Sequence, residues 1–341
     1  MTNIFKYPLY FLDIFGSGKS FSQNPVLGNY RLNSWGLHKW RVQIAAGMAG
    51  SRRRRLAPQL SAEDREQLTR YGYLIKKNYL PDPIFRQLEA EIYSRPFAAR
   101  EMRQGPAVTR MIALGPGMLQ SMPVTGKLLQ DRRLRNMLSF AASYGGEPVY
   151  MIHAIMVDPG LKQSDPQADL HSDTFHSTAK AWLFLHDVGP DDGPFAYVPG
   201  SHLLTPERLQ WEYEQSLTAR SDPRSHHSYG SLRITRPELQ RLGYTPETVS
   251  VKANTLVVAD TRGFHGRTPS RKPTMRISLD VYLRRGPFLP WTGFDISSLP
   301  FLKGRSLDLY LAYLDLLENK FGKRSIWRDV GKTPVNAPAN I

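Results

Sequence analysis

The chain has 341 residues, of which 41% are hydrophobic and 22% are charged, a composition that is typical of a globular protein and excludes a largely disordered or fibrous chain. It contains no cysteine, so disulfides, thiolate metal sites, iron–sulfur clusters and cysteine nucleophiles are excluded, and any metal must be bound by histidine and carboxylate. The net charge of +15 raises nucleic acid and anionic membranes as partners.

Residues 1–60 differ from the rest of the chain in charge and composition. Nine lysines and arginines stand against a single acid, Asp13, so this segment carries more than half of the net charge. An aromatic opening, a middle rich in Gly, Ser and Asn, and the run Arg52–Arg55 predict a basic, aromatic N-terminal arm. Two alternatives stay open: an extension packed on the domain, or a surface that contacts acidic lipid through its aromatic and basic side chains.

The sequence shows no signal for secretion or membrane insertion. It begins without the basic, apolar and small-residue regions of a signal peptide, and no stretch reaches the roughly 18 apolar residues of a spanning helix. We therefore expect a cytoplasmic protein, with peripheral contact at the inner face of a membrane through residues 1–60 as an alternative. Nucleic acid is a less favoured partner, and the oligomeric state is left open.

A folded domain is predicted to begin at residue 61. Ser61–Asp64 is a helix N-terminal signal, in which a capping serine is followed three residues later by an acid. Tyr71–Ile75 predicts a short strand, and Pro81–Pro83 opens a second helix in which apolar residues recur every four positions from Ile84. A helix, a strand and a helix thus precede the segment that carries the chemistry.

From Val149 onward the pattern indicates antiparallel strands. Apolar runs separated by turn residues predict strands at 149–157, 179–185, 195–198, 255–259 and 274–283. In the last of these, the polar side chains Arg276, Ser278, Asp280 and Tyr282 alternate with apolar ones. This polar face either lines an interior that holds a charged ligand or meets solvent.

The chain is thus predicted to have one main domain, residues 61–290, which is mainly β with flanking helices. The charged segment 203–248 is predicted to be an inserted helix-and-loop excursion. Residues 291–341 are predicted to form a C-terminal helix and tail, and the apolar spacing between 307 and 317 indicates an amphipathic helix that packs on the domain.

Three residues are candidate metal ligands. His171 and Asp173 lie two positions apart, so in extended backbone both side chains leave the same face and can converge on one ion. His265, which has Gly263 and Gly266 beside it, is the candidate third ligand. Two histidines and a carboxylate on one face of an octahedron leave three positions open, which suits Fe(II) that binds a bidentate 2-oxo acid and O2.

A 2-oxo acid such as 2-oxoglutarate carries a second carboxylate that must be neutralised in a partly buried pocket. Arg276 stands 11 residues after His265 on the polar face of the predicted strand 274–283, and arginine is the fork-shaped partner that a carboxylate prefers. Ser278 shares this face and is predicted to donate a further hydrogen bond. We therefore assign Arg276 and Ser278 to 2-oxoglutarate binding.

From about residue 61 to 285 the chain resembles the phytanoyl-CoA dioxygenase family of Fe(II)/2-oxoglutarate oxygenases. The motifs that carry the resemblance are Tyr71–Ile75, a Leu-Pro helix start, His171-x-Asp173, Trp182–Asp187, Asp192-Gly-Pro-Phe, Tyr197–His202, His265 and Arg276. The resemblance implies a double-stranded β-helix, that is, a jelly-roll or cupin-like core. It also implies that His171, Asp173 and His265 bind iron and that Arg276 binds 2-oxoglutarate, with no further catalytic residue.

The chain departs from the usual sequence of this family in residues around the predicted metal site. Family members often carry Asn about five residues after the distal histidine, where this chain has Ser270 in an unusually basic run, 266–273. Near the predicted site, His202 is interpreted as a turn residue, Trp182 as a core residue and Lys180 as a lysine that reaches toward solvent. These differences bear on the substrate more than on the metal.

The predicted function is a dioxygenase that uses Fe(II), 2-oxoglutarate and O2 to hydroxylate an unactivated C–H bond. Its substrate is expected to be small or lipid-like, with anionic and membrane-associated molecules among the options. Halogenation is disfavoured because Asp173 fills the position that related halogenases leave for halide. Two alternatives remain: a non-catalytic barrel protein that binds a membrane or a partner through its basic arm, and a nucleic-acid demethylase.

Overall fold

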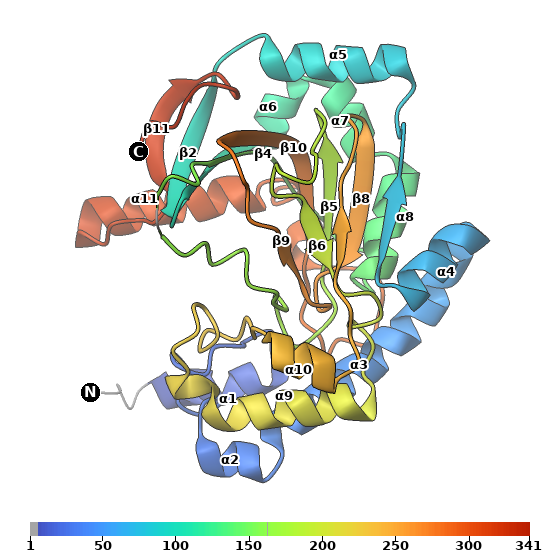
Figure 1. Ribbon diagram of the computed structural model, residues 1–341, viewed down its shortest axis with the longest axis vertical. Helices are drawn as coiled ribbons and strands as arrows, with labels where there is room; N and C mark the ends of the chain where they lie inside the picture. Colours follow the sequence, from blue (N-terminus) through green and yellow to red (C-terminus); the bar gives the residue numbers. More distant parts are fainter. Residues whose placement is uncertain (1–5, 162) are drawn as a thin grey trace.

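A large antiparallel sheet forms the centre of the protein in the computed structural model, which describes residues 6–161 and 163–341 (Figure 1). The strands are β1 Tyr73–Lys76, β2 Phe97–Gln104, β3 Ala107–Ala113, β4 Val149–Val157, β5 Ala179–Phe184, β6 Phe195–Tyr197, β7 Glu247–Val249, β8 Thr255–Asp260, β9 His265–Arg267, β10 Thr274–Leu283 and β11 Arg328–Thr333.

Helices surround this sheet. They are α1 Tyr7–Leu12, α2 Tyr30–Ser34, α3 Leu37–Leu56, α4 Ala62–Arg70, α5 Asp82–Tyr93, α6 Pro116–Gln120, α7 Pro123–Leu129, α8 Arg132–Ala141, α9 Pro206–Thr218, α10 Arg236–Arg241 and α11 Ser306–Phe321. Short 3-10 helices lie at Asp13–Phe15, Ala57–Gln59, Ala219–Ser221 and Ile296–Ser298. Within the described ranges, no helix combines the length and the apolar character needed to cross a membrane.

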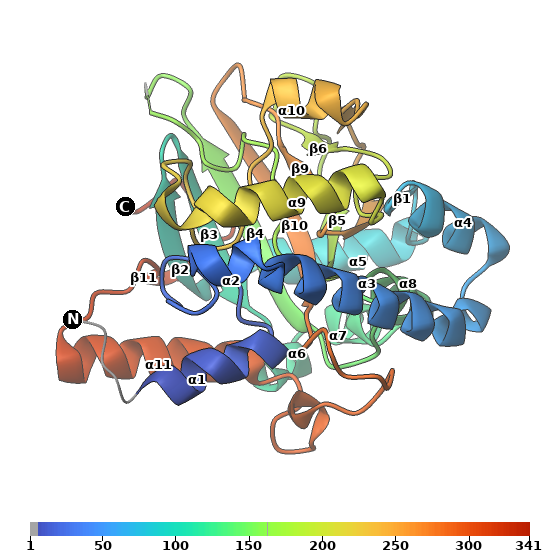
Figure 2. The ribbon, with the colours of Figure 1, turned by 90° about the horizontal axis from the view of Figure 1, so that it is seen from below.

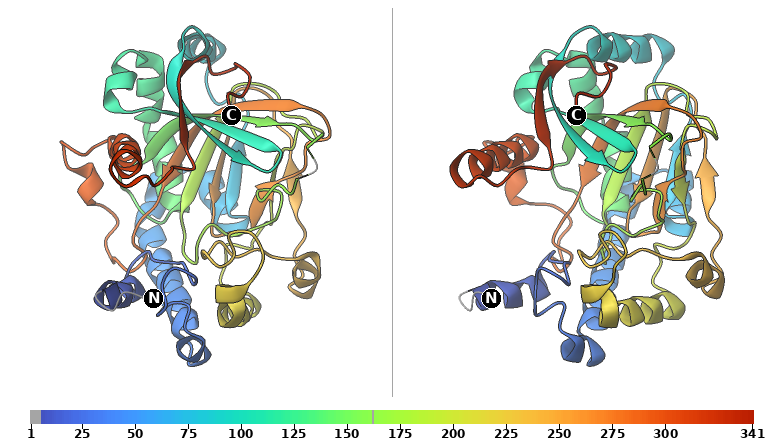
Figure 3. Two further views of the ribbon diagram at one scale, coloured as in Figure 1. Left: turned by 90° about the vertical axis from the view of Figure 1, so that its left-hand side faces the viewer. Right: turned by 60° about the vertical axis from the view of Figure 1, so that its left-hand side comes forward.

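Two sheets make up the β-structure. The larger has the strand order β1-β8-β5-β10-β4-β3-β2-β11, and the smaller has the order β7-β6-β9. Figure 3 shows β11, near the C-terminus, at the edge of the large sheet beside β2. Phe184 and Val257 of the large sheet pack with Phe195 and Tyr197 of the small one. This pair of facing sheets is the double-stranded β-helix that was predicted.

The two faces of the large sheet have different partners. Apolar side chains of β10, among them Ile277 and Leu279, belong to a buried core shared with α5, α7 and α8. The alternate residues of β10, which include Arg276 and Ser278, line a cavity on the other face. The polar alternation of this strand therefore serves an interior cavity and not solvent.

Several predicted elements occur where they were expected. The Ser61 hydroxyl accepts a hydrogen bond from the Asp64 amide at 3.1 Å and begins α4. β4 and β10 have the predicted bounds, 149–157 and 274–283. The predicted packing role of the C-terminal helix is not confirmed, because none of the residues of α11 is buried.

The segment predicted as an insertion, 203–248, contains α9 and α10 joined by loops. Each of these helices begins at a threonine cap, Thr205 and Thr235. Figure 2 shows α9 lying along α2 and α3, so this helix packs against the N-terminal helices. The exact boundaries of the domains stay a prediction.

The N-terminal segment is held by arginines that point into the protein. Arg41 is 2% exposed and donates to backbone carbonyls between residues 13 and 18. Arg52 is 3% exposed and donates to the carbonyl oxygens of Ser143, Pro287 and Leu289. Of the two alternatives for this segment, the structure therefore contains the packed one.

Arg53 completes this attachment. Its guanidinium lies 2.6 Å from Asp260 at the end of β8 and also donates to the Phe140 and Ala141 carbonyls. Arg52 and Arg53 thus turn inward because carbonyl oxygens and a carboxylate neutralise them, so half of the run that suggested lipid binding is not on the surface. Peripheral contact of residues 1–60 with an acidic membrane remains an untested prediction.

We expect Arg53→Ala to lower the free energy of unfolding by about 3–5 kcal/mol, because Asp260, which is 1% exposed, would lose its cation. Chemical denaturation followed by circular dichroism measures this. Arg54→Ala is the matched control, since Arg54 is exposed in the same run and its loss should change stability by no more than about 0.5 kcal/mol. Equal losses in both variants would contradict an anchoring role for Arg53.

Candidate metal centre

Backbone pairing brings the two ligand-bearing segments together. The amides of His171 and His265 each donate to the other residue's carbonyl oxygen at 2.9 Å, and the Asp173 amide donates to the Thr261 carbonyl at 2.9 Å. On the other side, the Ser172 amide donates to the Leu232 carbonyl at 3.0 Å. The segment that carries His171 and Asp173 thus lies between β9 and part of the insertion.

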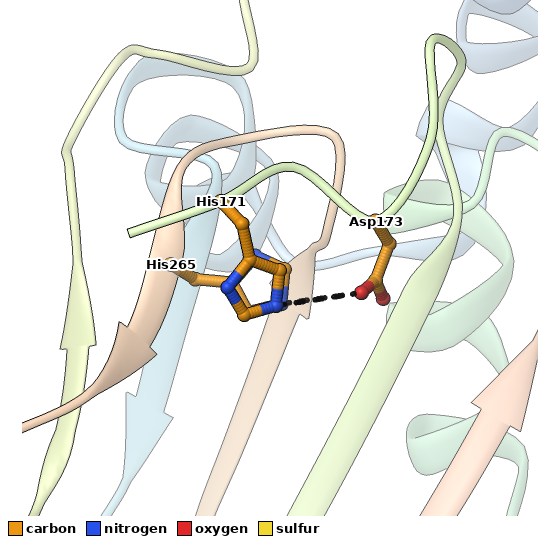
Figure 4. A group of neighbouring side chains, drawn as sticks. All are labelled: His171, Asp173 and His265. Atoms are coloured by element: carbon orange, nitrogen blue, oxygen red, sulfur yellow. Dashed lines mark ion pairs between the residues drawn. The ribbon is translucent and has the colours of Figure 1, made fainter. Parts of the chain in front are cut away.

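The side chains of His171, Asp173 and His265 converge on one point (Figure 4). One ligand atom from each lies within 4.8 Å of the other two. The Oδ1 atom of Asp173 is 3.8 Å from Nε2 of His171 and 3.7 Å from Nε2 of His265. All three residues are buried, with 7% or less of their surface exposed.

The hydrogen bonds of the two imidazoles favour metal binding. Nδ1 of His171 donates to the Asp169 carbonyl at 2.8 Å, and Nδ1 of His265 donates to the Gly263 carbonyl at 2.9 Å. Each ring therefore keeps the lone pair of Nε2, the atom that faces Asp173. Nε2 of His265 is buried without a hydrogen-bond partner, and a metal ion would satisfy it.

Protonation at neutral pH also suits a metal. Burial is the main cause that lowers the pKa of His171 and His265. Nearby cations, among them Arg233, also disfavour a positive charge on either ring, so both rings stay neutral. Burial alone would raise the pKa of Asp173, but the Lys180 ammonium and other nearby cations outweigh it and hold that pKa well below its usual value. The site presents two neutral imidazoles and one carboxylate, the ligand set of a non-haem iron site.

Glycine is required beside the distal histidine. A Cβ atom at Gly263 would collide with the hydroxyl of Tyr197, which donates to the Asp260 carbonyl at 2.8 Å. The Gly263 carbonyl is the acceptor for Nδ1 of His265, so this close approach also orients the ring. The glycine at position 263, noted beside His265 in the sequence, thus has a specific physical cause.

Three cations surround the ligand carboxylate. Nζ of Lys180 forms an ion pair with Oδ2 of Asp173 at 2.7 Å, and a guanidinium nitrogen of Arg284 lies 3.8 Å from the same oxygen. Nζ of Lys19 donates to the backbone carbonyl of Asp173. Burial, followed by repulsion from Arg284, lowers the pKa of Lys19 to about 8. The sequence interpretation was that Lys180 reaches toward solvent, but its ammonium instead pairs with the carboxylate of Asp173.

A cavity of about 780 Å³ opens beside the triad and contains both residues assigned to 2-oxoglutarate. Arg276 is 7% exposed, its Nε is buried without a partner, and among the described residues it forms no ion pair with a carboxylate. Its one polar contact is to the Gly193 carbonyl. Burial, together with repulsion from the nearby Arg267, lowers the pKa of Arg276 to about 9, so an anionic ligand would stabilise its charge.

Ser278 lines the same cavity but is engaged within the protein. Its hydroxyl donates to Oδ1 of Asp280 at 2.5 Å, so the predicted donation to 2-oxoglutarate would require this bond to break. Asp280 also accepts from Nδ1 of His153 at 2.8 Å and from the Tyr282 hydroxyl at 3.2 Å. This network across β4 and β10 was not anticipated, because nothing in the local sequence pairs His153 with Asp280.

Two further predictions concern residues near the triad. Trp182, interpreted as core, lines the cavity and packs on Phe195 with ring centroids 4.9 Å apart. His202 is buried in the turn after β6 and lies outside the group that could hold a metal, as expected for a turn residue. Burial lowers the pKa of its ring to about 4, so the ring stays neutral.

Comparison with known proteins identifies a family. The sequence model of the phytanoyl-CoA dioxygenase (PhyH) family matches residues 68–276. No curated protein sequence matches at a significant level.

Solved structures show more distant likenesses. The epimerase SnoN in complex with Fe3+, alpha ketoglutarate and nogalamycin RO is 20% identical with a TM-score of 0.42, over 64% of this chain and 81% of that one. HygX from Streptomyces hygroscopicus with nickel and 2-oxoglutarate is 16% identical with a TM-score of 0.39, over 66% and 87%. At this level of similarity neither a substrate nor a reaction can be carried over.

We expect Asp173→Ala to abolish tight Fe(II) binding, because the ion would lose its one anionic protein ligand. The loss in affinity should exceed the roughly 10- to 100-fold that removal of an outer-shell partner costs. Anaerobic equilibrium dialysis with metal analysis measures it. Asp191→Ala is the control, since Asp191 pairs with Arg271 on the surface and should leave binding unchanged. Tight binding by the Asp173 variant would refute the assignment.

We expect Arg276→Ala to keep Fe(II) affinity while weakening 2-oxoglutarate binding by about tenfold or more, because charge-assisted hydrogen bonds to a carboxylate would be lost. Calorimetric titration of the anaerobic Fe(II) protein measures this. Arg271→Ala, which removes an exposed guanidinium from the loop before β10, is the matched control. An unchanged affinity in the Arg276 variant would place the anchor elsewhere.

Proposed function

We propose that this chain, which belongs to the phytanoyl-CoA dioxygenase family, is an Fe(II)/2-oxoglutarate-dependent oxygenase that hydroxylates an unactivated C–H bond of a small or lipid-like molecule. The observation that carries the proposal is the shared cavity. It places a buried His-Asp-His group beside Arg276, a buried cation with an unpartnered nitrogen. A metal ion would satisfy the three ligands, and a carboxylate of 2-oxoglutarate would satisfy the guanidinium of Arg276.

The residues divide the work between binding and positioning. Bound Fe(II), with 2-oxoglutarate and O2, supplies the oxidation, in which one oxygen atom enters the C–H bond, the other enters succinate, and CO2 leaves. His171, Asp173 and His265 would hold the ion from one side, which leaves the cavity side free for ligands. Arg276 would bind the carboxylate remote from the metal.

Other side chains keep this arrangement in place. Lys180 would hold the oxygen of Asp173 that points away from the histidines, so that the carboxylate cannot rotate freely. The packed rings of Trp182 and Phe195 would exclude water from the wall of the cavity. Asp280, which accepts three hydrogen bonds, would keep the polar face of β10 rigid.

The size of the cavity favours a small ligand over a macromolecule. Its volume of about 780 Å³ falls within the roughly 300–1,000 Å³ of small-molecule sites. A non-catalytic barrel protein would have no need for an unpaired buried arginine beside three convergent ligands. Nucleic acid is supported by net charge alone, and part of that charge is neutralised inside the fold.

Anaerobic titration tests this function directly. We expect that adding Fe(II) and then 2-oxoglutarate to the full chain produces the weak visible charge-transfer band of an iron-bound 2-oxo acid. Succinate formation in air, measured with acyl-CoA esters, lipid-linked sugars and amino-acid derivatives, then reports the substrate. Dicarboxylates that lack a 2-oxo group, such as succinate, serve as controls and should give no band. Absence of the band at saturating concentrations of Fe(II) and 2-oxoglutarate would refute the proposed oxygenase function.

A further inference from the structure

A second cavity lies on the Asp173 side of the triad. Its volume is about 570 Å³, and it shares Arg284 and Asp295 with the cavity that contains Arg276. Its walls come from four separate parts of the chain: the N-terminal residues 17–19, Tyr144 after α8, the segment 174–178 that follows the ligand Asp173, and the segment 284–296 that follows β10. The two cavities therefore meet at Arg284 and Asp295, and Arg284, 3.8 Å from the Asp173 carboxylate, connects the second cavity to the metal-binding group.

Positive charge is in excess around this second cavity. Lys19, Arg284 and Arg285 line it, whereas Asp295 is the one carboxylate among its described lining residues. Asp295 is already engaged, because it accepts from the Tyr144 hydroxyl at 2.6 Å and from the Ser297 amide at 2.7 Å. The cations are thus left without a full set of counter-charges.

The carboxylate of Asp173 cannot supply the missing negative charge for Lys19 and Arg284. Asp173 contacts Lys19 through its carbonyl and Arg284 at 3.8 Å, but Lys180 holds its Oδ2 atom at 2.7 Å. A metal ion bound at Oδ1 would neutralise the same carboxylate from the other side. Loading the site with metal would therefore leave Lys19 and Arg284 facing the cavity without an anion.

Arg285 adds an independent observation. It is 9% exposed, and its Nε and Nη2 atoms are buried without hydrogen-bond partners. The guanidinium lies between the rings of Tyr144 and Trp291, with its carbon 4.1 Å and 5.4 Å from their centroids. A buried guanidinium with unpaired donors is costly, and an anion bound in the cavity would lower that cost.

The outer part of the cavity is apolar. Leu289, Trp291, Phe294 and Ile296 line it, and each of these side chains is more than one third exposed. Apolar side chains gathered at a cavity mouth are typical of a ligand-binding rim. Lys19 and Arg284 contact Asp173, whereas the apolar side chains belong to the segment 289–296, so the cavity has two chemically distinct parts.

The N-terminal segment builds the cationic part. Arg41 donates to carbonyl oxygens on both sides of Gly16, and these bonds fix the loop that carries Lys19 to Asp173. Arg52 joins Ser143 to the backbone of the rim at Pro287 and Leu289. The family match covers residues 68–276, so Lys19, Arg41 and Arg52 lie outside the matched range.

We propose that this second cavity is the substrate site and that Lys19 and Arg284 bind a carboxylate or phosphate group close to the carbon that is oxidised, with an apolar part of the substrate on the rim. The proposal rests on the proposed oxygenase function for its chemistry. The binding site itself is defined by residues outside the metal ligands. An anionic amphiphile whose charge lies next to its reactive carbon is the class of substrate that fits.

Calorimetric titration tests the proposal with probes of matched chain length. Decanoate, decyl phosphate and decanol are titrated into the full chain loaded anaerobically with Fe(II) and 2-oxoglutarate. We expect decanoate or decyl phosphate to bind at least about tenfold more tightly than decanol, because charge-assisted hydrogen bonds favour the anion. The tighter of the two anions identifies the headgroup. Equal binding of all three probes would overturn the proposal.

Variants locate the anion. Arg284→Met should weaken binding of the favoured anion by about tenfold without affecting decanol, and Lys19→Met should do the same. The Arg284 side chain is more than half exposed, so this variant is expected to fold even if Lys19→Met does not. Arg220→Met, outside the cavity, is the control. Unchanged anion binding in the Arg284 variant, or tight decanoyl-CoA binding that neither variant weakens, would overturn the assignment.

The calorimetric test of the anion site can fail or succeed independently of the test of the proposed oxygenase function. The charge-transfer band reports the metal and 2-oxoglutarate, whereas the heat of anion binding reports the second cavity. A band without selective anion binding would overturn this inference alone. Selective anion binding without a band would overturn the oxygenase and leave the anion site standing.

Discussion

A short antiparallel pairing between His171 and His265 is the contact on which the site depends. Two backbone hydrogen bonds of 2.9 Å join residues that are distant in the chain. Because His171 and Asp173 lie on one face of the same extended segment, this pairing sets the position of all three ligands together. The facing sheets, the glycine at 263 and the loop at Leu232, whose carbonyl accepts from the Ser172 amide, all support this pairing.

Buried positive charge is handled in two different ways in this protein. Arg41 and Arg52 are satisfied by backbone carbonyl oxygens, and the fully buried Arg110 combines carbonyls with an ion pair to Glu101 at 2.6 Å. Arg276 and Arg285 keep unpartnered nitrogens and line cavities. The first group stabilises the fold, whereas the second group is suited to bind anions, so the partner atoms, and not burial alone, distinguish structural from functional arginines.

The N-terminal segment connects these two roles. Its buried arginines attach it to α8, β8 and the loop after β10, and the same attachment places Lys19 beside the ligand Asp173. Figure 1 shows this segment with α9 and α10 below the sheets, where it forms one side of the protein. The high charge of the segment is thus partly a means of attachment, since Arg41, Arg52 and Arg53 point into the protein, whereas Arg54 and Arg55 are exposed.

The sequence by itself predicted the strand β10, with Arg276 on its polar face, and the placement of His171 and Asp173 on one face, because period-2 alternation and a two-residue spacing depend on local geometry, whereas the fold class came from the family resemblance. It did not predict β2 and β3, whose charged residues are buried as the pair Glu101 and Arg110 and therefore resemble exposed residues in the sequence. The direction in which Arg52, Lys19 and Lys180 point was decided by the tertiary structure alone, because the partner of a long flexible cation is whichever carbonyl or carboxylate the fold brings near, and no local pattern encodes that contact.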